Sequence, residues 1–147
     1  CILGINPVIV QDRCYDYIDV KDLARFIDQI YGFDNSYSNK IKESLLANNS
    51  MDINFCRGEV ISIKEIVEFI INRVNPNLEI DILKHGQGLS YGGSNNRMKT
   101  KFPEFKFTEI FEGISNQIDY YSGLQKTFDQ SLLEADHYLL HAKNVSK

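Results

Sequence analysis

Tyr17 and Lys21 match the Tyr-x-x-x-Lys pattern, whose chemistry is acid–base catalysis by a phenol. That chemistry requires both side chains on one helix face, so that the ammonium lowers the pKa of the phenol. The sequence predicts Tyr17 in a strand and Lys21 in the first turn of the following helix. We therefore interpret the match as a coincidence and expect a packed Tyr17 and a solvated Lys21.

A second pattern is the glycine spacing Gly86, Gly88 and Gly92, which follows a predicted strand. A dinucleotide-binding loop needs glycines that lead directly into a long helix and then into a second strand. The helix predicted here, over residues 95–101, is too short for that purpose. The glycines are expected to shape a loop around a ligand or to form a turn.

Metal and thiol chemistry have little support. His137 and His141 lie four residues apart, as metal ligands can, but only Glu134 accompanies them. A solvated helix face is the simpler interpretation. Cys1, Cys14 and Cys56 are odd in number and lack Cys-x-x-Cys spacing, so reduced thiols in a cytoplasmic protein are expected.

The elements that must position these residues begin with short strands over 7–10 and 15–18. Asp19 is the expected N-cap of a helix that stops at Gly32. Its expected apolar face contains Val20, Leu23, Ala24, Ile27, Ile30 and Tyr31. Residues 33–52 are rich in Asn and Ser and predict a surface excursion, with a short helix over 40–47.

The clearest helix start is the capping box of Ser62 and Glu65, which follows short strands predicted at 53–55 and 60–61. Pro76 forbids continuation of this helix. Its expected buried face contains Ile66, Val67, Phe69, Ile70 and Val74.

Alternating residues over 78–82 predict a strand, and residues 95–101 predict a short helix. Thr108 is the expected cap of a helix that ends at Gly123, with Ile110, Phe111, Ile114, Ile118 and Tyr121 on one side. The spacing of apolar residues predicts a further amphipathic helix in the tail, residues 124–147.

The composition suits one globular domain. The 147 residues are 43% hydrophobic and 24% charged, and the net charge is −4. Scattered cations argue against nucleic acid as a partner. No apolar run reaches the ~20 residues that cross a bilayer, so no membrane partner is expected. Because the first residue is Cys rather than Met, we expect a fragment or split protein.

Three stretches occur in a characteristic order: Tyr-Asp-Tyr-Ile-Asp-Val-Lys-Asp-Leu-Ala at 15–24, Phe-Cys-Arg-Gly-Glu-Val-Ile-Ser-Ile-Lys-Glu-Ile at 55–66, and Tyr-Gly-Gly-Ser-Asn-Asn-Arg-Met at 91–98. Their order and spacing resemble the C-terminal half of extended short-chain dehydrogenase/reductases that act on nucleotide-activated sugars. The resemblance covers about residues 5–122. It implies a mixed α+β lobe over 1–123, with helices packed on short strands and with the N-terminal Rossmann half missing.

The resemblance also implies substrate contacts. Tyr15 stands where the family usually has an arginine for the diphosphate, and Arg13 is the candidate replacement; a solvated surface arginine is the alternative. Lys84 occupies the place of a second cation, and Gln87 that of a ribose-binding acid. Tyr91 resembles an aromatic wall beside the sugar, or is a core tyrosine packed under the glycine loop. Arg57 and Gly58 are expected to be structural, and Asn95 to cap the short helix.

The implied function is that of a substrate-binding lobe of an NAD(P)-dependent nucleotide-sugar epimerase, dehydratase or reductase. NAD or NADP would bind the missing half, so this chain alone needs no cofactor and has no catalytic residue. Expected partners are a nucleotide-sugar, the Rossmann half or a companion subunit, and further copies of the chain. One alternative is a non-catalytic ligand-binding or interaction module derived from that family. A second is an unrelated small α/β domain.

Overall fold

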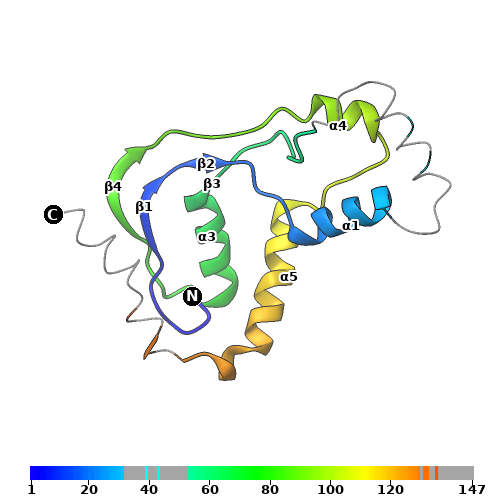
Figure 1. The fold of residues 1–147 in the computed structure, drawn as a ribbon. Helices are drawn as coiled ribbons and strands as arrows, with labels where there is room; N and C mark the ends of the chain where they lie inside the picture. Colours follow the sequence, from blue (N-terminus) through cyan, green and yellow to red (C-terminus); the bar gives the residue numbers. More distant parts are fainter. Residues whose placement is uncertain (32–38, 40–42, 44–52, 130, 133–134, 136–147) are drawn as a thin grey trace.

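The computed structural model describes residues 1–31, 39, 43, 53–129, 131–132 and 135. The chain is a mixed α/β domain of helices and short strands (Figure 1). In chain order the elements are β1 (Val8–Asp12), β2 (Cys14–Tyr15), α1 (Val20–Tyr31), β3 (Ile61–Ser62), α3 (Ile63–Val74), β4 (Asp81–Gln87), α4 (Asn96–Lys101), α5 (Ile110–Gly123) and the 3-10 helix η1 (Gln125–Thr127).

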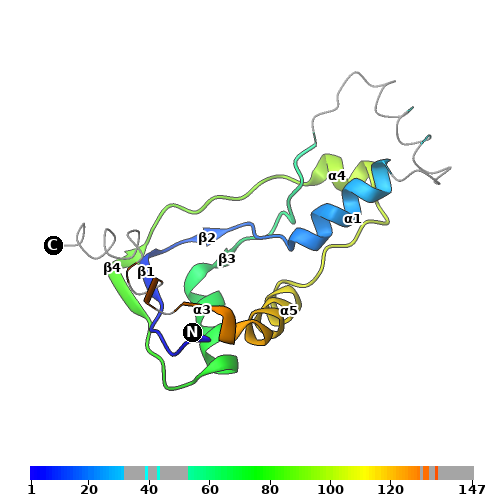
Figure 2. The ribbon, with the colours of Figure 1, turned by 60° about the horizontal axis from the view of Figure 1, so that its bottom comes forward.

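The strands form two small pairs. β1 pairs with β4 in parallel, whereas β2 pairs with β3 in antiparallel orientation. Helix α3 follows β3 directly and packs against β1 and α5. Helices α1 and α4 lie at the other end of the molecule, joined to the strand pairs by extended segments (Figure 2).

The strand predictions are partly confirmed. The strand expected at 7–10 is β1, but the one expected at 15–18 ends already at Tyr15. Residues 53–55 form no strand, because no strand of the described chain pairs with them. The strand expected at 78–82 begins later, at Asp81, and continues through Gly86 to Gln87, where a loop was expected.

Helix α3 begins at its predicted N-cap residue, Ser62, but only one of the two hydrogen bonds of the capping box is formed. The Ser62 hydroxyl accepts a hydrogen bond from the Glu65 N–H at 3.2 Å, as expected for an N-cap. The reciprocal contact of the capping box, from the Ser62 N–H to the Glu65 carboxylate, is not formed between these described residues. Asp12 Oδ1 supplies the further contacts, accepting from the Lys64 N–H at 3.1 Å and from the Ser62 hydroxyl at 2.7 Å. Asp12 therefore fixes the end of β1 to the start of α3.

Helix α1 confirms the predicted cap but corrects the predicted face. Asp19 Oδ1 accepts from the Lys21 N–H at 2.8 Å, and the helix ends at Tyr31. Its buried residues are Asp22 and Phe26, with Ile30 packed against the same cluster. The expected apolar face is instead largely exposed, since the helix packs through residues spaced four apart on another side. The exposed members are Val20, Leu23, Ala24, Ile27 and Tyr31.

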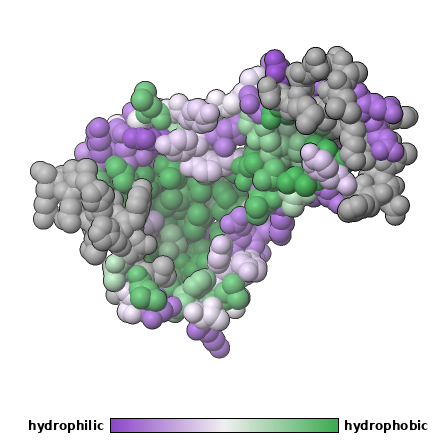
Figure 3. All heavy atoms as spheres, in the orientation of Figure 1, coloured by the Kyte–Doolittle hydropathy of each residue, from purple (hydrophilic) through white to green (hydrophobic). Residues whose placement is uncertain are grey.

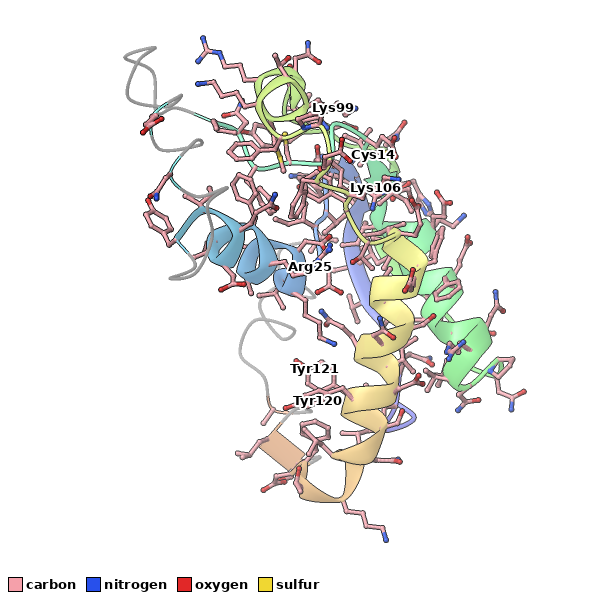
Figure 4. The ribbon with its side chains drawn as sticks, turned by 90° about the vertical axis from the view of Figure 1, so that its right-hand side faces the viewer. Cys14, Arg25, Lys99, Lys106, Tyr120 and Tyr121 are labelled. Carbon is pink, nitrogen blue, oxygen red and sulfur yellow. The ribbon has the colours of Figure 1, made fainter. Side chains whose placement is uncertain are left out.

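The buried carboxylate of Asp22 explains this orientation. Asp22 Oδ2 accepts from the Thr108 N–H at 2.8 Å, and Oδ1 accepts from the Thr108 hydroxyl at 2.7 Å and from Arg25 at 2.5 Å. Arg25 also donates to the Lys106 carbonyl at 2.9 Å (Figure 4). The prediction that Thr108 caps the last long helix is wrong: Glu109 is the N-cap residue of α5, and the Thr108 side chain serves Asp22.

An aromatic core joins α1, α4 and two connecting segments. Phe26, Met98 and Phe102 are buried together. The Phe26 ring lies 4.8 Å from the rings of both Phe55 and Phe102 and 5.3 Å from that of Phe105. Such ring pairs stabilise a core beyond their buried area.

A separate aliphatic core occupies the other end. Ile9 of β1, Ile71 of α3 and Ile118 of α5 are buried there. The tail begins with η1 rather than an α-helix, and most of residues 130–147 lie outside the described chain. The helix predicted at 40–47 lies mainly outside it as well. Within the described residues, no helix combines the length and apolarity needed to cross a bilayer.

Candidate functional site

All four residues that the sequence singles out lie on one ribbon of backbone. The pairing of β1 with β4 continues beyond Gln87, because the Gly88 N–H donates to the Asp12 carbonyl at 2.7 Å. Further along, the Tyr91 N–H donates to the Cys14 carbonyl at 2.9 Å. Residues 8–16 and 81–91 therefore run side by side, and Arg13, Lys84, Gln87 and Tyr91 belong to this ribbon (Figure 1).

The ribbon contains a register shift that depends on glycine. Gln11 is opposite Lys84, whereas the next residue, Asp12, is opposite Gln87. Gly86 lies within the shift with φ +84°, in the left-handed region that side chains disfavour. The glycine thus sets where Gln87 and Gly88 stand relative to Arg13.

Replacing Gly86 by alanine is expected to lower the free energy of unfolding by about 1 kcal/mol. Since no atom lies within 4 Å of the added Cβ, the cost comes from the backbone conformation alone. Urea denaturation of the variant measures this loss. Gly123→Ala is the matched control, because that glycine has open space and no positive φ. Equal stability of both variants would contradict the assignment of strain to Gly86.

Arg13 lies directly over Gly88. A Cβ at position 88 would stand 2.8 Å from both Cγ and Nε of Arg13 and 2.8 Å from Gln11 Oε1. Arg13 Nη1 is 3.5 Å from the Tyr15 hydroxyl, and the Arg13 side chain is exposed. We call Gln11, Arg13, Tyr15 and Gly88 the Arg13 cluster. An exposed guanidinium can bind a carboxylate or phosphate through two parallel hydrogen bonds.

The other predicted residues relate to this cluster differently. Lys84 is exposed and opposite Gln11, the last pair before the register shift. Gln87 is engaged elsewhere, because its Nε2 donates to Cys14 Sγ at 3.0 Å. Tyr91 is 75% exposed, so the alternative of a packed core tyrosine is wrong. Its role as a wall beside a sugar stays a prediction.

Tyr17 connects the Arg13 cluster to a pocket. The rings of Tyr15 and Tyr17 meet edge to face at 5.9 Å. Tyr17 also lines a pocket of about 310 Å³ between the start of α1, α3 and the first turns of α5. Its walls are Ile18, Ile63, Ile66, Ile110, Gly113 and Ile114, with Asp19, Thr108, Glu109 and Gln117 as polar members. The pocket suits a ligand with both apolar and hydroxyl groups.

Tyr17 is unsuited to the redox role that its sequence pattern suggests. It precedes α1, whose first turn contains Lys21, so the two residues do not share a helix face. Burial raises the pKa of the Tyr17 phenol, and the nearby Tyr15, Asp12 and Cys14 raise it further. A phenol that acts as a base near neutrality needs the opposite shift.

A larger apolar groove adjoins this pocket. It has a volume of about 610 Å³ and lies between the N-terminal residues, α3 and α5, where hydrophobic residues gather in Figure 3. Ile66, Ile114 and Gln117 line both hollows. The remaining lining is Cys1, Ile2, Leu3, Ile5, Ile70, Ile118, Tyr121 and Phe128, which includes no charged side chain. Such a groove can hold apolar groups of a ligand or protein partner.

Residues 57, 58 and 95 form internal contacts. The Asp16 carboxylate accepts from the N–H groups of Arg57 at 2.9 Å and Gly58 at 2.8 Å. The Arg57 guanidinium donates to the Thr108 carbonyl, and Asn95 Nδ2 donates to the Arg57 carbonyl. Asn95 precedes α4 as expected, but its side chain makes this contact and no cap hydrogen bond. These residues tie three connecting segments together.

The remaining candidates give no second site. Cys1, Cys14 and Cys56 are free thiols, as predicted. No group of three metal-ligating side chains occurs in the part of the chain that the structure describes. Glu134, His137 and His141 lie outside that part.

Sequence reasoning missed Gln11 and Tyr15 as parts of the cluster. The available signal was the alternation of polar and aromatic residues at 11, 13, 15 and 17, which places side chains on one side of an extended segment. Gly88 was singled out by its glycine spacing, but its close approach to Arg13 comes from the pairing of two distant segments.

Comparisons with known proteins complete the description of the site. No protein-family model, no curated protein and no solved structure matches this chain.

Proposed function

We propose that this chain is the sugar-nucleotide-binding lobe of an NAD(P)-dependent epimerase, dehydratase or reductase. The observation that carries the proposal is the Arg13 cluster, in which an exposed guanidinium lies over a glycine. The absence of a side chain at Gly88 lets Arg13 lie against the ribbon, and its exposed guanidinium can donate two hydrogen bonds to a diphosphate. Lys84, near the same edge, adds a second positive charge without the planar fork of arginine.

The residues proposed to bind the sugar are chosen for their ring and hydrogen-bonding groups rather than for positive charge. Tyr91 presents an exposed ring, which can pack against the C–H groups of a sugar. The pocket beside Tyr17 offers hydroxyl partners in Asp19 and Glu109, whereas the polar groups of Thr108 are already bound to Asp22 and Arg57. Such a lobe binds the diphosphate and orients the sugar. The binding energy of the remote diphosphate then holds the reacting sugar carbon in place.

The redox step belongs to a partner outside these residues. That partner binds NAD or NADP and supplies the acid–base tyrosine, since Tyr17 has a raised pKa. The 610 Å³ groove is the surface for this redox half, because its lining lacks charged side chains and apolar hollows of this size favour burial. The chain alone is expected to show no turnover with NAD and nucleotide-sugars.

Replacing Arg13 by alanine is expected to weaken nucleotide-sugar binding about ten- to a hundredfold, since hydrogen bonds to a charged group contribute about 1.5–3 kcal/mol. Amide NMR titration of the whole chain with UDP-, dTDP- and GDP-glucose measures the affinity. Lys126→Ala is the control, as Lys126 is exposed on η1 and away from the ribbon. If all three ligands leave the spectrum unchanged, or if the Arg13 variant binds as tightly as the parent, the proposal fails.

The second candidate is a non-catalytic ligand-binding or interaction module. It is favoured by Tyr15, which stands where the resembled family has an arginine and which contacts Arg13 instead. The coding DNA upstream of the Cys1 codon distinguishes the two. A βαβ unit with Gly-x-x-Gly-x-x-Gly there supports the catalytic assembly, whereas its absence together with nucleotide-sugar binding supports the module.

A further inference from the structure

Helix α1 exposes an apolar stripe that is largely open in the described chain; its first residue, Val20, borders a hollow with Tyr120 and Tyr121 of α5. Val20 is 66% exposed, Ile27 48% and Tyr31 60%. Ala24 is exposed between them, and Leu23 flanks them at 38%. The helix is anchored to its own domain by Asp22, Phe26 and Ile30, so the stripe is free to meet another surface. Figure 3 shows hydrophobic residues over this region as well as over the groove.

The spacing of the stripe is that of a helix–helix seam. Val20, Ala24, Ile27 and Tyr31 are separated by four, three and four residues. Val20 and Ile27 are seven residues apart, as are Ala24 and Tyr31, so the four residues follow the heptad spacing by which two helices pack side by side. The small residue Ala24 lies near the middle, where a close approach of two helix axes is easiest.

Two opposite charges border one side of the stripe. Lys21 and Asp28 are seven residues apart, about two helical turns, and thus lie on the same flank. Within the described residues neither side chain has an ion-pair partner. Arg25 is different, since it is held by Asp22 and by the Lys106 carbonyl.

We propose that a second copy of this chain binds along α1, with the two α1 helices antiparallel across a two-fold axis. An antiparallel pair brings the same flank of both helices together. Lys21 then faces Asp28 of the partner subunit, and the axis repeats this contact. A parallel pair would instead place this flank against Leu23 and Ile30, which carry no charge, and Ile30 is already packed in the aromatic core.

The two stripes also interleave in this arrangement. With the axis midway between Lys21 and Asp28, the two Ala24 residues stand next to each other at the centre. Ile27 of each copy falls between Val20 and Ala24 of the other. The apolar side chains thus alternate along the seam instead of colliding, as knobs-into-holes packing requires.

This interface goes beyond the proposed function and uses different residues. None of the stripe residues lines the 610 Å³ groove, and none belongs to the Arg13 cluster. The seam begins beside the groove, because Val20 borders a hollow with Gln117 and Tyr121, which line the groove as well. The dimer and the ligand-binding proposal can fail separately, because their tests substitute different residues.

Charge reversal tests the pairing. Lys21→Glu places a carboxylate against Asp28 of the partner subunit twice in the dimer, and Asp28→Lys places two ammonium groups together twice. Each variant is expected to weaken the dimer about tenfold or more in low salt, measured by sedimentation equilibrium of the whole chain. Each change puts a charge at the helix end that favours it, so lost association does not reflect a lost helix.

An equimolar mixture of the two variants restores attraction in both ion pairs, and the expected result is recovery of parental affinity. The double variant Lys21→Glu/Asp28→Lys is expected to recover it alone. Lys126→Glu is the charge-matched control and is expected to dimerise normally. Ile27→Asp is expected to give a monomer with an unchanged circular dichroism spectrum. A parent that is monomeric at every concentration, or single variants that the mixture fails to rescue, would overturn the proposal and indicate another occupant of α1.

Discussion

Replacing Asp22 by alanine is expected to lower the free energy of unfolding by about 2–4 kcal/mol. The Asp22 side chain is fully buried, and it accepts hydrogen bonds from the Thr108 N–H, the Thr108 hydroxyl and Arg25. Removing the carboxylate leaves the part-buried Thr108 N–H and hydroxyl without their acceptor, which costs more than the bonds themselves contribute. Arg25 is half exposed and keeps the Lys106 carbonyl, so it adds less to the loss. Urea denaturation followed by circular dichroism measures the loss.

The same residue gives stability a pH dependence of known sign. Burial acts to raise the pKa of the Asp22 carboxyl, but the hydrogen bonds from Arg25 and Thr108 outweigh it, and the pKa is lowered. The folded state therefore favours the ionised form. Its contribution is complete above the unfolded pKa of about 3.9 and is lost as pH falls through the lower folded value.

Two variants separate this effect from its alternatives. Asp22→Asn keeps the volume and is expected to reduce the slope of stability against pH in acid. Asp81→Asn, on an exposed part of β4, is the surface control and is expected to change stability little. An Asp22→Ala protein within about 1 kcal/mol of the parent would show that the buried contacts contribute no more than surface ones.

Replacing Phe102 by alanine is expected to cost about 3–5 kcal/mol of stability. The ring is 2% exposed, ends α4, and meets Phe26 edge to face at 4.8 Å. Truncation removes apolar burial and leaves a cavity that rings on three other segments cannot close, since their positions are fixed by separate elements. Thermal and urea unfolding measure the loss.

Graded replacements check that the cavity is the cause. Phe102→Leu keeps much of the volume and is expected to lose less than half as much stability. Tyr120→Ala removes an aromatic ring that is 65% exposed and is expected to have a small effect. Similar losses for the leucine and alanine variants at position 102 would contradict the cavity explanation.

Local signals predicted where elements begin and end. Asp19 and Ser62 cap the helices they were expected to cap, since their hydrogen bonds involve residues two or three positions away. Thr108 has the same kind of sequence signal, but a buried carboxylate 86 residues away in the chain competes for its hydroxyl. Contacts at such separation are invisible to periodicity and capping rules.

The prediction of which side of α1 is buried was wrong for a related reason. Apolar periodicity favoured the stripe of Val20 and Ile27 as the side that packs, and a charged residue at position 22 argued against the opposite side. The polar partners that make Asp22 tolerable inside come from residues 106–108, so its burial could not be read locally.

The candidate site shows the same division. The family resemblance implied that Arg13, Lys84, Gln87 and Tyr91 contact one substrate, and the pairing of β1 with β4 places their segments side by side. The face of the paired strands on which each side chain lies was not predictable, because it depends on a register shift at Gly86. Gln87 consequently turns to Cys14, while Gln11 reaches Gly88.

The separation of the aromatic and aliphatic cores has a consequence for how the molecule tolerates change. Ile9, Ile71 and Ile118 support one end, whereas Phe26 and Phe102 support the other. Hydrogen bonds, such as that from the Arg57 N–H to the Asp16 carboxylate, connect the segments between the two ends. A substitution that destabilises the aromatic core can therefore leave the register of β1 and β4 around Arg13 intact. Ligand affinity and thermal stability can then change independently of each other.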